Sequence, residues 1–362
     1  MYGIKNRNLH IRQSNWELLR IISMLAIVAG HFFGQSGAYD VLRGTDLYIA
    51  LFLGGASRIA VSLFLMLGVW FLVDSSFKAE RIIKLYAQYF YYSCLPVLIL
   101  FFLGFTISHR EIAAAIFPYS FSAWFVTTYL ALLLIAPFLQ KILLWDEESL
   151  KKFTIVSFLL ISGVASIHKL TDTYLDTVIW FFFMYIAIGY YKHHLSDKIH
   201  INKWLMLVLG GGIYVALVTL LWLGYNGTMV TIGHIASNYL SDYKSIPNLC
   251  VAFPVFYFFE HLEIEPNQFI NRCAKSALAV YLIHQAPGII HPLWFDFYHC
   301  DVYLTGRFPF LYSTGVVFSC YFLASFIDIF RFKAVEPYFT STSLYNHLSR
   351  QLTRFYSRSK GE

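Results

Sequence analysis

Long apolar runs alternate with short polar segments along the whole chain. A helix needs about 20 apolar residues to cross a hydrocarbon core about 30 Å thick, and these runs reach or approach that length. They cover residues 17–36, 48–73, 82–104, 122–144, 153–169, 174–191, 204–224, 246–260, 276–294 and 308–330. The pattern predicts an all-α polytopic membrane protein with about ten transmembrane helices.

Basic residues fall mostly in alternate loops. With a cytoplasmic N-terminus, most of the 27 Lys and Arg residues lie in inside segments, including the loop of Lys78 and the tail after Arg331. Outside segments carry few, such as Arg43 and Arg307. Because cytoplasmic loops are enriched in Lys and Arg, both termini are expected inside. We expect one transmembrane domain over residues 1–340 and a basic cytoplasmic tail over 341–362.

Composition supports a membrane protein and excludes an ordinary soluble one. The chain is 58% hydrophobic and only 13% charged, whereas soluble proteins average about 25% charged residues. The net charge of +6 therefore belongs to cytoplasmic loops, and the lipid bilayer is the expected partner, with no nucleic acid. The five Cys form no CxxC pair, so we expect small embedded hydrophobes and no metal site.

The first apolar run carries ionisable residues in an unusual arrangement. Arg20 and His31 are eleven residues apart, which is close to three helical turns, so they share one face and are separated by a rise of about 16 Å. If the helix enters the bilayer near Arg20, His31 lies near the midplane. Glu17 is three residues before Arg20 and can pair with it at the cytoplasmic rim.

Two more ionisable residues are expected at a similar depth. Arg58 lies within the second run and His284 within the ninth. Intramembrane ionisable groups are costly and mark functional sites by default, so a shared polar cavity with His31 is predicted. The structural alternatives are helix–helix hydrogen bonds for the histidines and a counter-ion role for Arg58.

Two features near the membrane surfaces have simpler interpretations as well. Arg81 and Lys84 share a helix face at the inner end of the third run. With Arg20 they form a possible phosphate site, although such residues are also ordinary positive-inside anchors. Trp124 starts the fourth run and Tyr129 follows it, which on physical grounds alone is an aromatic belt at the interface.

Together these segments resemble the acyltransferase-3 family of integral membrane acyltransferases, of the bacterial polysaccharide O-acetyltransferase type. The matching segments follow the family order and cover nearly the whole chain. They are Arg20 with His31, residues 61–68, residues 81–86, Trp124-Phe125 with Tyr129 and Pro137, and residues 281–284. Leu67 stands where the family pattern has Ser, and Lys84 stands where many relatives have Arg.

The resemblance implies a ten-helix fold in a bacterial inner membrane and a catalytic role for His31. It also implies acetyl-CoA or another acyl-CoA as cytoplasmic co-substrate and a carbohydrate acceptor, a surface polysaccharide or its lipid-linked precursor. We expect Arg20, Arg81 and Lys84, with Glu17 beside them, to hold the donor, and Trp124 and Tyr129 to contact substrate.

In this hypothesis His31 acts as general base or carries the acyl group, and Arg58 stabilises the oxyanion or positions the acceptor. His284 is the third catalytic candidate. The alternatives from other classes are a glycan transporter or flippase, which a polar midplane cavity also serves, and a polysaccharide polymerase.

Overall fold

A computed structural model describes residues 13–118, 123–167 and 174–357. Within these ranges the chain is helical and contains no strand. One set of helices lies at the predicted spans. They are α1 (Ser14–Gln35), α3 (Gly44–Leu72), α4 (Ala79–Phe102), α6 (Trp124–Ile142), α7 (Glu147–Phe158) continuing to α8 (Val164–Ile167), α9 (Tyr174–Tyr190), α10 (Lys203–Tyr225), α12 (Ile246–Glu260), α14 (Ala277–His284) and α16 (Pro309–Phe330).

Further helices lie between and after these spans. They are α2 (Ala38–Val41), α5 (His109–Ile116), α11 (Val230–Ser241), α13 (Gln268–Cys273), α15 (Cys300–Tyr303), α17 (Glu336–Ser341) and α18 (Ser343–Ser357). Within the described ranges, seven helices are long and apolar enough to cross a membrane. The fold is therefore the all-α polytopic membrane protein that the sequence predicts, whereas the number ten stays a prediction.

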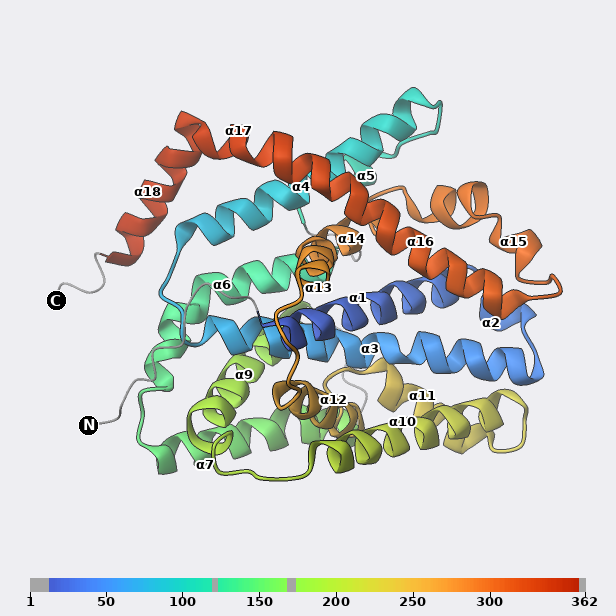
Figure 1. Ribbon diagram of the computed structural model, residues 1–362, viewed down its shortest axis with the longest axis horizontal. Coiled ribbons are helices and arrows are strands. Elements are labelled where there is room, and N and C mark those ends of the chain that lie inside the picture. Colours follow the sequence, from blue (N-terminus) through green and yellow to red (C-terminus); the bar gives the residue numbers. More distant parts are fainter. Residues whose placement is uncertain (1–12, 119–122, 168–173, 358–362) are drawn as a thin grey trace.

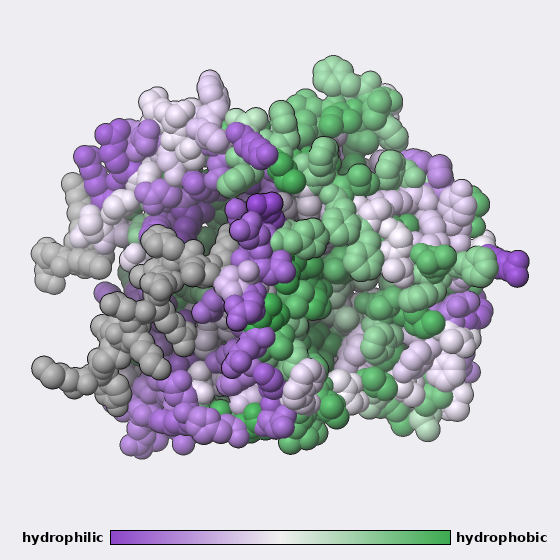
Figure 2. Space-filling model, viewed as in Figure 1, coloured by the Kyte–Doolittle hydropathy of each residue, from purple (hydrophilic) through white to green (hydrophobic). Residues whose placement is uncertain are grey.

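The surface of the molecule carries a hydrophobic zone across the helices. Figure 2 shows this zone in green over the middle of the molecule, with hydrophilic residues gathered at the left-hand end. Exposed large apolar side chains cover the flanks of α4, α10 and α16, including Phe102, Val208 and Phe326. Because such a zone is stable only against lipid, it marks the part of the surface that lies in the bilayer.

The predicted inside loops meet at one end of the bundle. Asp74 after α3 pairs with Lys192 after α9 at 2.6 Å, and Glu147 at the start of α7 pairs with Lys198 at 2.9 Å. Lys203 at the start of α10 donates to the carbonyl of His261 after α12. These contacts agree with the alternation of loops on which the predicted orientation rests. Residues 1–12, 169 and 358–362, which include basic residues of that count, lie outside the described ranges.

One predicted span is wrong as a continuous helix. The run 276–294 contains α14, which ends at His284, followed by a turn in which Gly288 has a φ of +74°. The chain resumes as the π-helix η5 (Pro292–Phe297). The apolar run continues through this turn at residues 285–289, where Ala286 is 1% exposed, and into η5, where Trp294 is 0% exposed, so its composition reflects burial rather than one continuous helix.

The predicted tail does not stand apart from the bundle. Residues 343–357 form α18, which packs against α4, and Ser349 donates to the carboxylate of Glu80. Tyr356 of α18 stacks on Phe77 with ring centroids 4.0 Å apart.

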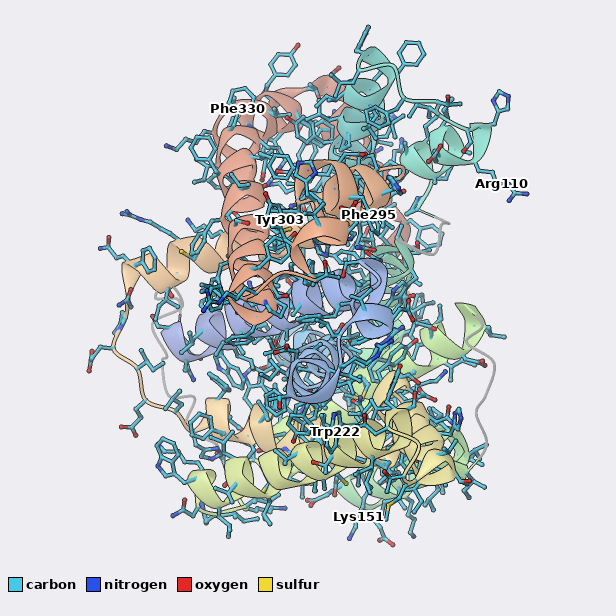
Figure 3. The ribbon with its side chains drawn as sticks, turned by 90° about the vertical axis from the view of Figure 1, so that its right-hand side faces the viewer. Arg110, Lys151, Trp222, Phe295, Tyr303 and Phe330 are labelled. Carbon is cyan, nitrogen blue, oxygen red and sulfur yellow. The ribbon has the colours of Figure 1, made fainter. Side chains whose placement is uncertain are left out.

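Helices α1 and α3 form the centre of the bundle and run antiparallel (Figure 1). Seen from the opposite end to the inside loops, they are enclosed by α14–α16 above and by α10–α12 below (Figure 3). Gly30 makes their close approach possible, since a Cβ there would lie 2.1 Å from Cβ of Ser57. His31 and Arg58 follow these two residues and are therefore at the same level of the bundle.

A second close contact joins α10 and α11. Gly224 of α10 faces Gly233 of α11, and a Cβ on Gly224 would lie 2.6 Å from the Cα of Gly233. Small residues at such a crossing let two backbones touch. This contact holds α11 against the mouth of the bundle, where α11 supplies Ser237 and Ser241 to a cavity described below.

We expect Gly224→Ala to destabilise the protein. The added methyl meets backbone atoms that cannot rotate away, and overpacking of this kind costs about 1–3 kcal/mol. Gly212→Ala in the same helix is the control, since a Cβ there meets nothing within 4 Å. Thermal unfolding in detergent measures both. Equal melting temperatures for the two variants would show that the α10–α11 crossing is not tight.

Candidate functional site

Two histidines from distant parts of the chain form a buried pair. The distance between Nδ1 of His31 in α1 and Nε2 of His284 in α14 is 2.8 Å, and Nδ1 of His284 lies 2.6 Å from the carbonyl oxygen of Val280. His284 has no exposed surface, whereas His31 is partly exposed and lines a cavity. Only His31 can therefore meet a substrate directly.

The hydrogen bonds of the pair assign its protons. The Val280 carbonyl can only accept, so Nδ1–H of His284 donates to it, and a neutral His284 then has an acceptor at Nε2. Nδ1–H of His31 donates to that acceptor. This leaves Nε2 of His31 with a free lone pair, which is the requirement for a base or a nucleophile.

Arg58 shares the cavity of His31. Its guanidinium lies 5.9 Å from the ring centroid of Tyr243. Trp124 also stacks on Tyr243, with parallel rings at a centroid distance of 5.5 Å. Among the described residues, no carboxylate lies within ion-pair distance of Arg58, so its charge is available to an anion.

The cavity at His31, here called the outer cavity, has a volume of about 360 Å³. Its wall combines aliphatic and aromatic side chains with a few hydroxyl and amide groups, a lining typical of small-molecule sites. The members that carry this character are Gln35, Tyr39, Trp124, Tyr225, Ser237, Ser241, Tyr281 and Gln285. Gln35 and Gln285 hold each other through reciprocal amide bonds of 3.2 Å.

A second cavity, here called the inner cavity, lies toward the end of the bundle where the predicted inside loops meet. It has a volume of about 200 Å³ and is lined by Arg20, Lys275 and Tyr129, among others. Arg20 pairs with Glu17 at 3.5 Å, and the side chain of Glu17 is 9% exposed. Glu17 therefore orients Arg20 and does not itself line either cavity.

The remaining predicted cations lie elsewhere. Arg81 donates to Ser75 at 2.6 Å and lines a small separate pocket of about 20 Å³. Lys84 pairs with Glu336 of α17 at 3.1 Å, and Glu336 also accepts from Arg331 at 2.8 Å. The structure thus brings Arg20 to a cavity and places Lys84 in an ion-pair network between α4 and α17.

Three contributors to these sites were not predicted from the sequence. Lys275 was counted only as a loop charge, although it sits three residues before Leu278 on the helical stretch that carries His284. Gln285 follows His284 directly, which is a signal of a polar site within an apolar run. Tyr243 carries no such signal, because it lies in a polar stretch between α11 and α12.

The bundle and its histidine pair define a multi-pass membrane protein with the features of an enzyme. A family model described as an acyltransferase domain matches residues 13–327, nearly the whole chain. The chain therefore belongs to the acyltransferase-3 family, and it is a membrane acyltransferase. Comparisons with curated proteins and with solved structures gave no match. Within the described ranges, no group of three or more His, Cys, Asp or Glu residues could hold a metal ion.

We expect the two cavities to be reachable from opposite sides of the membrane. In a cysteine-free background, Ser241→Cys should react with a membrane-impermeant maleimide added outside, because Ser241 lines the outer cavity. Lys275→Cys should react only when the reagent reaches the inside. Labelling in intact cells and in inverted vesicles measures this. Reaction of both variants from the same side would contradict the arrangement.

Proposed function

We propose that this protein transfers an acyl group, in the simplest case acetyl, from cytoplasmic acyl-CoA to a hydroxyl of a carbohydrate. The acceptor is a surface polysaccharide or its lipid-linked precursor, presented at the outer face of a bacterial inner membrane. The observation that carries the proposal is the histidine pair, in which His31 lines the outer cavity next to a basic inner cavity.

The inner cavity suits the donor. CoA carries phosphates, and Arg binds phosphate with two parallel hydrogen bonds while Lys acts as a point charge. Arg20 and Lys275 supply one of each at the inner cavity. Arg20 precedes His31 by a rise of about 16 Å along α1, a distance that the extended pantetheine arm of CoA covers.

The outer cavity suits a sugar. Trp124 offers a ring face, and Ser237, Ser241 and the Gln35–Gln285 pair offer donors and acceptors. Sugars combine apolar ring faces with hydroxyl edges, so they match this lining. The position of Trp124 supports the predicted substrate contact, whereas Tyr129 lies at the inner cavity and belongs with the donor.

The reaction follows from the proton assignment. Nε2 of His31 removes the proton from the acceptor hydroxyl as its oxygen attacks the thioester carbonyl carbon. Arg58 stabilises the charge that develops on the carbonyl oxygen. The C–S bond then breaks, the CoA thiolate leaves, and His31 returns the proton to it. His284 positions the ring of His31 and stabilises it while it carries the extra proton.

The presence of an O-acylated product tests the function as a whole. Polysaccharide from cells with and without the protein is compared by NMR, and the O-acyl signals should depend on the protein. Membranes that contain the protein should release free CoA thiol from acetyl-CoA when the same polysaccharide is added. Absence of both changes would refute the proposed substrates.

We expect His31→Gln to lower kcat by about 10²- to 10⁴-fold, the usual loss of a general base. His284→Gln should lower it less, because it removes orientation and leaves the base. His291→Gln is the control, since His291 is 75% exposed and pairs with Asp296 outside both cavities. CoA release measures all three. The protein can also be incubated with radioactive acetyl-CoA in the absence of acceptor. Label retained on His31 would contradict the general-base mechanism and support a covalent acyl-histidine intermediate.

We expect Arg20→Gln to raise KM for acetyl-CoA by about 10- to 100-fold, the value of a hydrogen bond to a charged group. With acetyl-pantetheine, which lacks the nucleotide phosphates, variant and wild type should have similar KM values. Arg43→Gln is the control, because Arg43 bonds only its own loop carbonyl at Leu42. An equal rise with both donors would place Arg20 away from the phosphates.

A further inference from the structure

Three apolar residues line both cavities. They are Phe64 of α3, Phe125 of α6 and Leu278 of α14. Each comes from a different helix, and the cavity of Arg20 adjoins the cavity of His31 at these residues. Within the described structure, these three residues are the only ones that line both cavities, and they are here called the partition.

The order of residues along the helices confirms that the partition lies at one level. Along α3, Leu67 and Gly68 line the inner cavity, Phe64 lines both, and Arg58 lines the outer cavity. Along the helical stretch of α14, the order is Lys275, Leu278 and Gln285. Both helices therefore pass from the inner to the outer cavity at the partition.

The partition is packed and apolar. The rings of Phe64 and Phe125 meet edge to face with centroids 5.8 Å apart, and Phe125 also stacks on Tyr129 and contacts Tyr281. Charged residues lie on both sides of the partition. Arg20 and Lys275 line the inner cavity, and Arg58 lines the outer cavity. A hydrophobic constriction of this kind excludes water and ions.

We propose that the partition is a gate that insulates the membrane, admits the pantetheine arm and limits the length of the acyl group. The limit on acyl length rests on the proposed function, whereas the insulating role does not. The thioester must pass between the rings to reach Nε2 of His31. The acyl group then shares an outer cavity of about 360 Å³ with the acceptor, so each added methylene meets the partition or the sugar.

Widening the partition should have two effects. In Leu278→Ala and Phe64→Leu proteins, the ratio of kcat/KM for octanoyl-CoA to that for acetyl-CoA should rise at least about tenfold, the value of one methylene in a tight pocket. CoA release with polysaccharide from the same cells measures this. Proteoliposomes of the same variants should leak chloride several times faster than wild type, because the cavities then join.

Leu217→Ala is the matched control. Leu217 is a buried leucine of α10 and lines neither cavity, so its truncation loosens the bundle without opening the partition. It should keep both the acyl ratio and the leak of wild type. Thermal unfolding of each variant confirms that it is folded.

The outcomes separate the two proposals. Wild-type protein that releases no CoA from acetyl-CoA refutes the proposed function, and the chloride leak still tests the partition. Wild-type transfer with an unchanged acyl ratio or an unchanged leak in both variants overturns the gate. The same changes in Leu217→Ala overturn it too, since they would follow from loosening alone.

Discussion

The structure depends on satisfying two imidazoles in the middle of an apolar helix bundle. A polar group in the hydrocarbon region must find its partners within the protein, because lipid offers none. The Val280 carbonyl satisfies His284, and His284 satisfies one side of His31. That chain of bonds fixes how α14 sits against α1. It also leaves a single unsatisfied nitrogen, and a cavity lies beside it.

The helix termini and the close crossings serve this arrangement. Val280 and His284 are four residues apart in α14, so the imidazole of His284 lies one helical turn from the Val280 carbonyl and can donate to it. His284 is also the last residue of α14. Gly30 brings α3 against α1 one residue before His31, which carries Arg58 to the same level. His31 and Arg58 are thus positioned by the close packing at Gly30, and His284 by the end of α14.

The sequence predicted the long helices well and the site in part. Apolar length and the spacing of Lys and Arg determine spans, because the bilayer imposes both. The depth of His31, Arg58 and His284 followed from helical rise alone. The end of α14 was missed because the apolar run continues through the turn at residues 285–289, which is apolar through burial and not through helix formation. The ion pair of Lys84 could not be predicted, since its partner Glu336 is 252 positions away and no local pattern records such a pair. A role of Lys84 in holding the donor stays a prediction.

The arrangement separates two tasks that a soluble transferase performs in one open cleft. Charges that suit phosphates stand at the inner cavity, and groups that suit a sugar stand at the outer cavity. In the proposed reaction the polar substrates do not need to cross the bilayer, because only the thioester arm of the donor would pass between the cavities. This requires that the reactive nitrogen lie near the middle of the membrane. The cost of burying His31 there is offset by His284, whose own proton is held by the backbone. A single histidine without that partner would turn freely and present either nitrogen, so the pair supplies the orientation that the chemistry needs.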